Sequence, residues 1–274
     1  HGPVSLRVAL ASSLNVPAVR TLDQIGVAAL LDTAHRFGLR TLTDAEVYGL
    51  ALTLGGGEVR LLDLTNAYAA LATGGLLGQP YAIERVRDAA GRVLYERESL
   101  PAARVIPAQD AFILADILSD ANARRLGFGE AIALSLPYRA AVKTGTTTEF
   151  RDNWTLGFTP ERAVGVWVGN TDNTPMRDVS GVDGAGPIWR SVMEAAHAGV
   201  APTFSGTAPA ASASTHRPKH APGPSRRGWR WRPARSSRAR HPSSCSRGRE
   251  ACCFWRRSCR RSRPSCGPRR RRAP

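Results

Sequence analysis

The stretch RAAVKTGTT at residues 139–147 decides how the fold of this chain is interpreted. Small apolar residues lead into a lysine, a glycine and three threonines, which indicates a short β-strand that ends in polar groups. Because Gly145 has no Cβ, a second peptide backbone can lie close to the strand at that position. We therefore expect a strand at the edge of a sheet, where an extended peptide adds by main-chain hydrogen bonds.

More β-structure is predicted on both sides of this stretch. Two strands are expected directly after it, at about 153–159 and 163–170, joined by a turn at 159–162. Apolar and polar residues alternate over 81–96 around the turn sequence DAAG at 88–91, which predicts a β-hairpin.

Apolar residues at helical spacing predict four helices, which cover about 22–37, 61–73, 107–119 and 186–197. The last helix is expected to direct Ile188, Val192 and Met193 inward. A capping box is expected at Thr43, whose hydroxyl would serve one free N–H group while the Glu46 carboxylate serves another. Helices followed by antiparallel strands and a closing helix indicate an α+β fold, in which helices cover an antiparallel sheet.

Charge divides the chain into two parts of different composition. Residues 1–204 hold 18 basic and 21 acidic side chains, whereas residues 205–274 hold 20 basic side chains and a single acid. The net charge of +16 therefore comes from the C-terminal part. We expect one folded domain over 1–204, which is long enough to bury a core, and a separate basic tail over 205–274.

The tail is expected to be disordered. After Val200 the sequence contains no Leu, Ile, Val or Met, so this segment cannot bury enough apolar surface to offset the entropy of ordering. Its residues are those of GC-rich codons, which fits translation in a shifted reading frame. The functional alternative is a nucleic-acid-binding arm, because Trp229, Trp231 and Trp255 alternate with arginines. We consider nucleic acid an unlikely partner, since the body carries a net charge of −3.

No metal or cofactor is expected. All five cysteines lie in the tail, and their spacing matches no zinc-binding pattern.

Lys143 is the only lysine in residues 1–204, which otherwise contain 17 arginines. A lysine ammonium is a compact charge with a pKa that its surroundings can shift, unlike a guanidinium. Beside an edge strand, Lys143 and the hydroxyls of Thr144 and Thr146 could hold a terminal carboxylate, and the Thr146 N–H could donate to a developing oxyanion. The alternative is a strand lysine that faces solvent.

Three stretches together resemble one known family. Ser13-Leu14-Asn15 lies within 5–19, the sequence GLALTLGGGEV begins a second landmark at 49–75, and the lysine motif opens a third stretch at 140–189. S-x-N and K-T-G are motifs of penicillin-binding proteins and class A β-lactamases. Over about residues 1–198 the chain resembles the transpeptidase domain of class A penicillin-binding proteins, most closely the 1C subgroup.

The resemblance implies a serine β-lactamase/transpeptidase-like fold whose N-terminal part precedes this chain. In that family a serine of an S-x-x-K motif attacks the D-alanyl-D-alanine end of a peptidoglycan stem peptide, and β-lactams trap the acyl-enzyme. By motif position Ser13 would relay a proton to the leaving nitrogen, and Asn15 would hydrogen-bond the substrate amide. Lys143 would supply positive potential and help deprotonate or orient Ser13. Residues 144–147 (Thr144, Gly145, Thr146 and Thr147) would bind substrate.

The sequence departs from the family at one essential point. Only Lys143 and Lys219 exist, and Ala140 and His216 stand three residues before them, so no S-x-x-K is present. We expect the nucleophile, a glycosyltransferase domain and an inner-membrane anchor upstream, with the parent on the periplasmic side of that membrane. The chain alone is expected to be inactive. A serine β-lactamase or D,D-carboxypeptidase relative is the alternative within enzymes, and the landmark at 49–75 argues against both.

Overall fold

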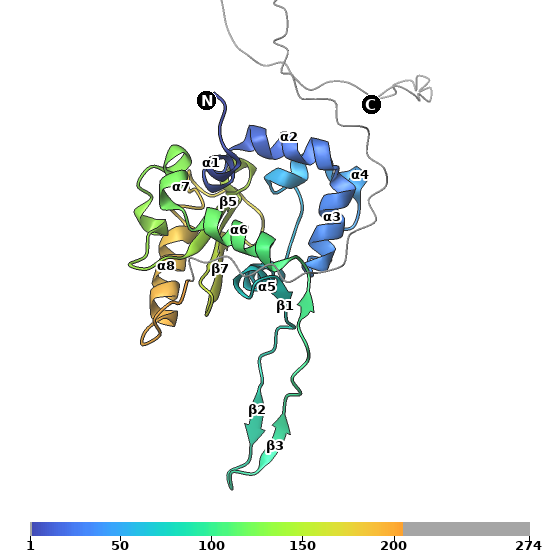
Figure 1. Ribbon diagram of the computed structural model, residues 1–274, viewed down its shortest axis with the longest axis vertical. Helices are drawn as coiled ribbons and strands as arrows, with labels where there is room; N and C mark the ends of the chain where they lie inside the picture. Colours follow the sequence, from blue (N-terminus) through green and yellow to red (C-terminus); the bar gives the residue numbers. More distant parts are fainter. Residues whose placement is uncertain (1, 205–274) are drawn as a thin grey trace, which may run out of the picture. The chain divides into compact units, whose positions relative to one another are not determined.

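The computed structural model describes residues 2–204 (Figure 1). The expected disordered tail at 205–274 lies outside the described residues. Within them the chain forms the predicted α+β arrangement of helices on an antiparallel sheet.

The central sheet has the antiparallel order β5-β6-β7, formed by β5 (Ala141–Thr146), β6 (Asp152–Phe158) and β7 (Ala163–Gly169). All three strands were predicted. The Thr159 N–H donates to the Arg162 carbonyl at 2.8 Å and closes the expected turn between β6 and β7. Among residues 2–204, β5 pairs only with β6, so it is an edge strand of this sheet, as the sequence indicated.

One face of the sheet is covered by α8 (Ala185–Ala196), which buries Trp189 and Met193 completely. The helix was predicted, but the expectation that Ile188 and Val192 face inward was wrong, because these side chains are 48% and 43% exposed. The indole of Trp189 lies where a Cβ on Gly157 would approach it to 2.4 Å. The indole ring therefore packs against the backbone of Gly157, where no side chain stands in its way, and this contact fixes the rotation of α8 about its own axis.

The opposite face is covered by α5 (Leu61–Ala72) and α6 (Ala108–Leu118). Both were predicted, and glycines 74 and 75, with φ of 70° and 91°, end α5 as expected. Gly165 allows α5 to approach β7, because a Cβ there would lie 2.0 Å from Thr65 Oγ1. Three further elements were not revealed by the sequence pattern: α7 (Ala121–Phe128), which packs against α1, η2 (Ile132–Leu134), which packs against α8, and η3 (Thr148–Phe150).

The N-terminal helices are α1 (Leu6–Ala11), α2 (Asn15–Ile25), α3 (Val27–Arg36) and α4 (Ala45–Tyr48), followed by η1 (Gly49–Leu54). The single helix expected at 22–37 was wrong, because Gly26 adopts a φ of 84° and separates α2 from α3. The expected capping box at Thr43 was also wrong. Asp44 is the N-cap residue of α4, and its carboxylate accepts the Glu46 N–H at 2.9 Å.

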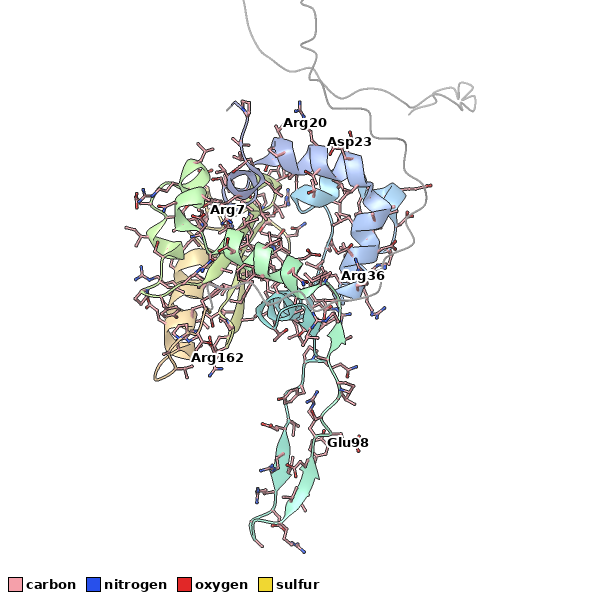
Figure 2. The ribbon with its side chains drawn as sticks, viewed as in Figure 1. Arg7, Arg20, Asp23, Arg36, Glu98 and Arg162 are labelled. Carbon is pink, nitrogen blue, oxygen red and sulfur yellow. The ribbon has the colours of Figure 1, made fainter. Side chains whose placement is uncertain are left out.

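The predicted hairpin is present as β2 (Arg85–Arg87) and β3 (Val93–Glu96) and projects away from the helices and the central sheet (Figure 1). The pair β1 (Leu76–Leu77) and β4 (Ala103–Arg104) forms its base. Figure 2 shows Glu98 on this projecting arm. Among residues 2–204, no helix has the length and apolar character required to cross a bilayer.

Candidate active site

The loop between α1 and α2 holds Ser13 in an unusual backbone conformation. Ser13 has a φ of 55°, which a non-glycine residue adopts only when its surroundings fix it. The neighbouring Ser12 donates its hydroxyl to the Ala123 carbonyl of α7 at 2.7 Å. A Cβ on Gly127 of α7 would lie 2.2 Å from the Ser12 carbonyl oxygen, so the glycine permits this close packing. The serine loop is therefore supported by α7.

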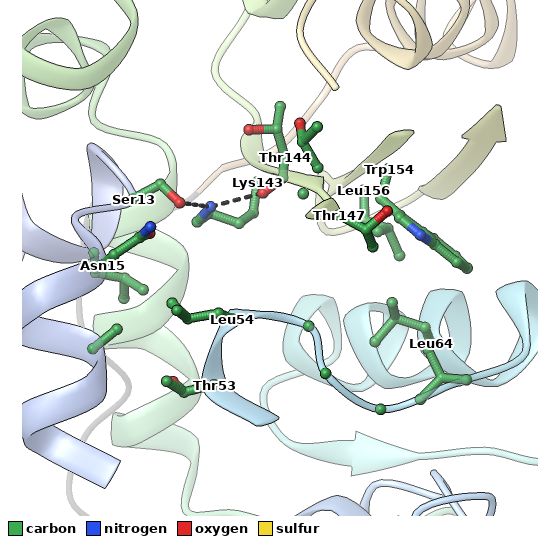
Figure 3. Close-up of a pocket in the computed structure, with 18 of the residues that line it drawn as sticks. Ser13, Asn15, Thr53, Leu54, Leu64, Lys143, Thr144, Thr147, Trp154 and Leu156 are labelled. Atoms are coloured by element: carbon green, nitrogen blue, oxygen red, sulfur yellow. Dashed lines mark hydrogen bonds between the residues drawn. The ribbon is translucent and has the colours of Figure 1, made fainter. Parts of the chain in front are cut away.

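Lys143 extends from β5 toward this loop. Its Nζ donates to Ser13 Oγ at 2.6 Å and to the Thr144 carbonyl at 2.8 Å (Figure 3). Asn15, the first residue of α2, lies beside Ser13 in the same view. The fold thus brings the two predicted motifs into direct contact, although 130 residues separate them in the sequence.

Burial and, to a smaller extent, the positive charge of Arg124 together lower the pKa of Lys143 to about 8. The lysine is partly exposed as a whole residue, but its ammonium end is enclosed by protein. Arg124 of α7 is only 6% exposed and donates to the Leu118 carbonyl at 2.7 Å. A lysine with this pKa can release or accept a proton near neutral pH. Sequence reasoning missed Arg124, which nothing distinguishes from the other arginines of the chain.

Ser13, Asn15 and Lys143 line a cavity of about 1170 Å³ between the sheet, α5 and the N-terminal helices. All seven residues predicted for the site contribute to its wall: Ser13, Asn15, Lys143, Thr144, Gly145, Thr146 and Thr147. The Thr146 hydroxyl oxygen accepts the Gly181 N–H at 2.9 Å, so its proton remains free to donate to a bound group.

The family model for the penicillin binding protein transpeptidase domain matches residues 1–194. The chain belongs to this transpeptidase family. It is 38% identical over 197 residues to penicillin-binding protein 2D of Bacillus subtilis, an alignment that covers 70% of this chain and 28% of that protein. The chain therefore spans little more than a quarter of that relative's length.

Solved structures of the family have the same fold. Penicillin-binding protein 1A from Haemophilus influenzae is similar with a TM-score of 0.67 and 27% identity, covering 76% of this chain and 36% of that one. PonA1 from Mycobacterium tuberculosis in complex with penicillin V is similar with a TM-score of 0.62 and 25% identity, covering 75% of this chain and 58% of that one. The narrower assignment to the 1C subgroup stays a prediction.

The transpeptidase motifs do not account for the whole cavity wall. Asp152 and Trp154 of β6 and Trp167 of β7 also line it. Side chains alternate between the faces of a strand, so these residues share the sheet face of Lys143 and Gly145. The alternation of side chains along the predicted strands already indicated that these residues share one face of the sheet. The sequence did not show which of the two faces lines the cavity.

Proposed function

We propose that this chain is the C-terminal part of the D,D-transpeptidase domain of a class A, 1C-type penicillin-binding protein that cross-links peptidoglycan. The observation that carries the proposal is the contact between Lys143 Nζ and Ser13 Oγ inside a cavity beside the free edge of β5. Family membership and the penicillin complex of PonA1 support it.

A donor stem peptide would lie antiparallel to β5 and add to its free edge. Lys143 and the hydroxyls of Thr144 and Thr146 would bind its terminal carboxylate, and the Asn15 carboxamide would hydrogen-bond a substrate amide. When the peptide bond breaks, Ser13 would pass a proton to the leaving amine nitrogen and recover one from Lys143. The lowered pKa of Lys143 suits this exchange, because the ammonium releases its proton more readily than an exposed lysine does.

The attacking serine belongs to an S-x-x-K motif in this family, and the present sequence has no such motif. We propose that a preceding segment of the parent protein supplies it, and that the chain alone does not form an acyl-enzyme. By the same family resemblance, the parent would also carry a glycosyltransferase domain and a membrane anchor and would act on the periplasmic side of the inner membrane. β-Lactams would acylate the complete domain.

The test uses a chimera in which the preceding part of the transpeptidase domain of B. subtilis penicillin-binding protein 2D is fused to this chain. A fluorescent penicillin should label the chimera stoichiometrically and leave the chain alone unlabelled. Ser13→Ala and Lys143→Ala in the chimera should each slow acylation by roughly 10²- to 10³-fold, which is typical of losing one preorganised polar group. Glu98→Gln, on the projecting hairpin, is the control and should label at the parental rate.

Two results would contradict the proposal. The first is stoichiometric labelling of the chain alone, which would require a nucleophile within it. The second is a chimera that labels at the same rate with or without Ser13 and Lys143.

A further inference from the structure

Helix α6 contacts both elements that carry the touching groups of the candidate site. It contacts α1, which leads into the Ser13 loop, and it contacts β5, which carries Lys143 (Figure 1). The apolar packing of α1 joins Ala11 to Ile117 of α6 and Ala123 of α7. The hydrophobic effect that drives such packing is non-directional, so it favours contact between these helices without fixing the position of one along the other.

One carboxylate of α6 binds an arginine from each of these two elements. Asp116 Oδ2 accepts a hydrogen bond from the Arg7 guanidinium of α1 at 2.5 Å, and Oδ1 accepts one from Arg139, just before β5 begins, at 2.5 Å. Arg139 Nε also donates to Ser119 Oγ at 2.8 Å. Hydrogen bonds between two charged groups are directional and about twice as strong as neutral ones. Arg7, Asp116 and Arg139, here called the Asp116 clamp, therefore join α1 to β5.

The Asp116 clamp is charged at neutral pH and also includes α7. The hydrogen bonds from Arg7 and Arg139 hold the pKa of Asp116 below its usual range, so the carboxylate stays ionised. The Arg7 guanidinium further donates to Asp120 Oδ2 at 3.3 Å. Asp120 is the N-cap residue of α7, the helix that supports the serine loop. A single arginine of α1 thus contacts both α6 and the start of α7.

The clamp contributes position more than stability. The side chains of Arg7, Asp116 and Arg139 are 41%, 32% and 37% exposed. Ion pairs this exposed contribute about 1 kcal/mol or less to folding. The contact between Ser13 Oγ and Lys143 Nζ is more sensitive, because it spans 2.6 Å and a displacement of about 1 Å would break the hydrogen bond.

We propose that Asp116 is a positioning residue, which holds α1 and β5 in one relative position so that Ser13 and Lys143 stay in contact. The inference rests on the proposed function, because it requires this contact to take part in the reaction. The cavity wall within residues 2–204 includes none of the three clamp residues. The clamp therefore acts through Ser13 and Lys143 and not on the substrate.

The first experiment measures the pKa of Lys143 in the whole chain by NMR of ¹³C-labelled lysine, with Lys143→Met to identify its signal. Asp116→Asn and Arg7→Gln each cut the clamp. If the clamp holds position, both variants let water reach the Lys143 ammonium, and its pKa should rise from about 8 toward 10.5 in both. We expect a change of roughly ten-fold in the acid dissociation constant.

The sign of the change separates position from charge. A direct effect of charge has opposite signs, because removing the anion Asp116 lowers the pKa of Lys143 and removing the cation Arg7 raises it. Glu96→Gln is the control, since it cuts the ion pair with Arg85 on the projecting hairpin and should leave the pKa at about 8. Shifts of opposite sign or no shift would overturn the proposal. An Asp116→Asn chain that does not fold would also overturn it, because it would assign the clamp to stability.

The second experiment tests whether the two ion pairs act as one unit in the chimera. Arg7→Gln and Arg139→Gln each remove one pair, and either loss disconnects α1 from β5. Each variant should slow the acylation step about ten-fold, and the double variant should be no slower than either single one. The Kd of the fluorescent penicillin should change by less than about two-fold. Losses that multiply in the double variant, or weaker penicillin binding with an unchanged acylation step, would contradict the clamp.

Lys143→Ala in the chimera separates this inference from the proposed function. If Lys143→Ala slows acylation and the clamp variants change neither the acylation rate nor the pKa of Lys143, the proposed function stands and the clamp does not. If Lys143→Ala labels at the parental rate, both are contradicted.

Discussion

Replacing Lys143 with methionine should stabilise the folded chain at neutral pH. Burial and the charge of Arg124 lower the pKa of Lys143 from 10.5 to about 8, so the fold disfavours the charged ammonium. A pKa difference of about 2.5 corresponds to about 3 kcal/mol. Methionine removes this cost but also the two hydrogen bonds to Ser13 and Thr144, which at about 1 kcal/mol each offset it by about 2 kcal/mol. We expect a net gain in the free energy of unfolding of about 1 kcal/mol at pH 7.

The gain should depend on pH in a defined direction. Below pH 8 the lysine is charged in both the folded and the unfolded state, so its cost is present in full. Between pH 8 and 10.5 the folded state has released the proton while the unfolded state retains it, so the stability of the unmodified chain rises with pH. The advantage of Lys143→Met should therefore be largest below pH 8 and should shrink as pH approaches 10.5.

Urea unfolding of both proteins at several pH values between 6 and 10.5 measures this difference. All other titratable groups are common to both proteins, so their contributions to the difference cancel. The reasoning fails if Lys143→Met is less stable than the unmodified chain at pH 7, or if the difference is the same at every pH.

Three other substitutions test neighbouring parts of the structure. Arg124→Met should raise the pKa of Lys143, because the substitution removes a nearby positive charge. NMR of ¹³C-labelled lysine can follow this pKa, because Lys143 and Lys219 are the only lysines of the chain. An unchanged pKa would show that burial alone lowers it. Gly127→Ala should destabilise the fold by roughly 1–3 kcal/mol, since its Cβ would lie 2.2 Å from the Ser12 carbonyl, whereas Gly78→Ala, with nothing within 4 Å, should change stability by less than about 0.5 kcal/mol. Trp189→Ala should cost about 3–5 kcal/mol and Ile188→Ala much less, and equal losses in chemical denaturation would contradict the observed rotation of α8.

The strands were predictable because their information is local. Alternating side chains and a turn at 159–162 are visible within a few residues, and β5, β6 and β7 appear where the pattern places them. The helix rotation was not predictable in the same way. Trp189 rather than Ile188 faces the sheet because Gly157 leaves room for an indole, and that match joins residues 32 positions apart. Gly26 was a local sign of a break between two helices, but apolar residues at helical spacing around it led to the prediction of one continuous helix.

The candidate site was also predictable only where the information is local in the sequence. K-T-G and S-x-N marked residues that line one cavity, but only the fold shows that Lys143 and Ser13 touch. Arg124 could not be found from the sequence, because its role depends on burial in α7 and on the path of the Lys143 side chain. Asp152 lies in the cavity because η3 and the hydrogen bonds of Thr147 return the chain beside the motif.

The use of one lysine among 17 arginines in residues 1–204 follows from the electrostatics of the site. Lys143 and Arg124 are two cations in a poorly solvated region, and they differ in how readily each can release a proton. A guanidinium stays charged in a protein and is weakly hydrated, so Arg124 tolerates burial with a carbonyl partner and supplies a permanent positive potential. An ammonium can relieve the same conflict by releasing its proton, and the pKa of about 8 places that release near neutral pH. Under the proposed function, an arginine at position 143 would keep the positive charge but would lose the proton exchange with Ser13, which favours a lysine at this position.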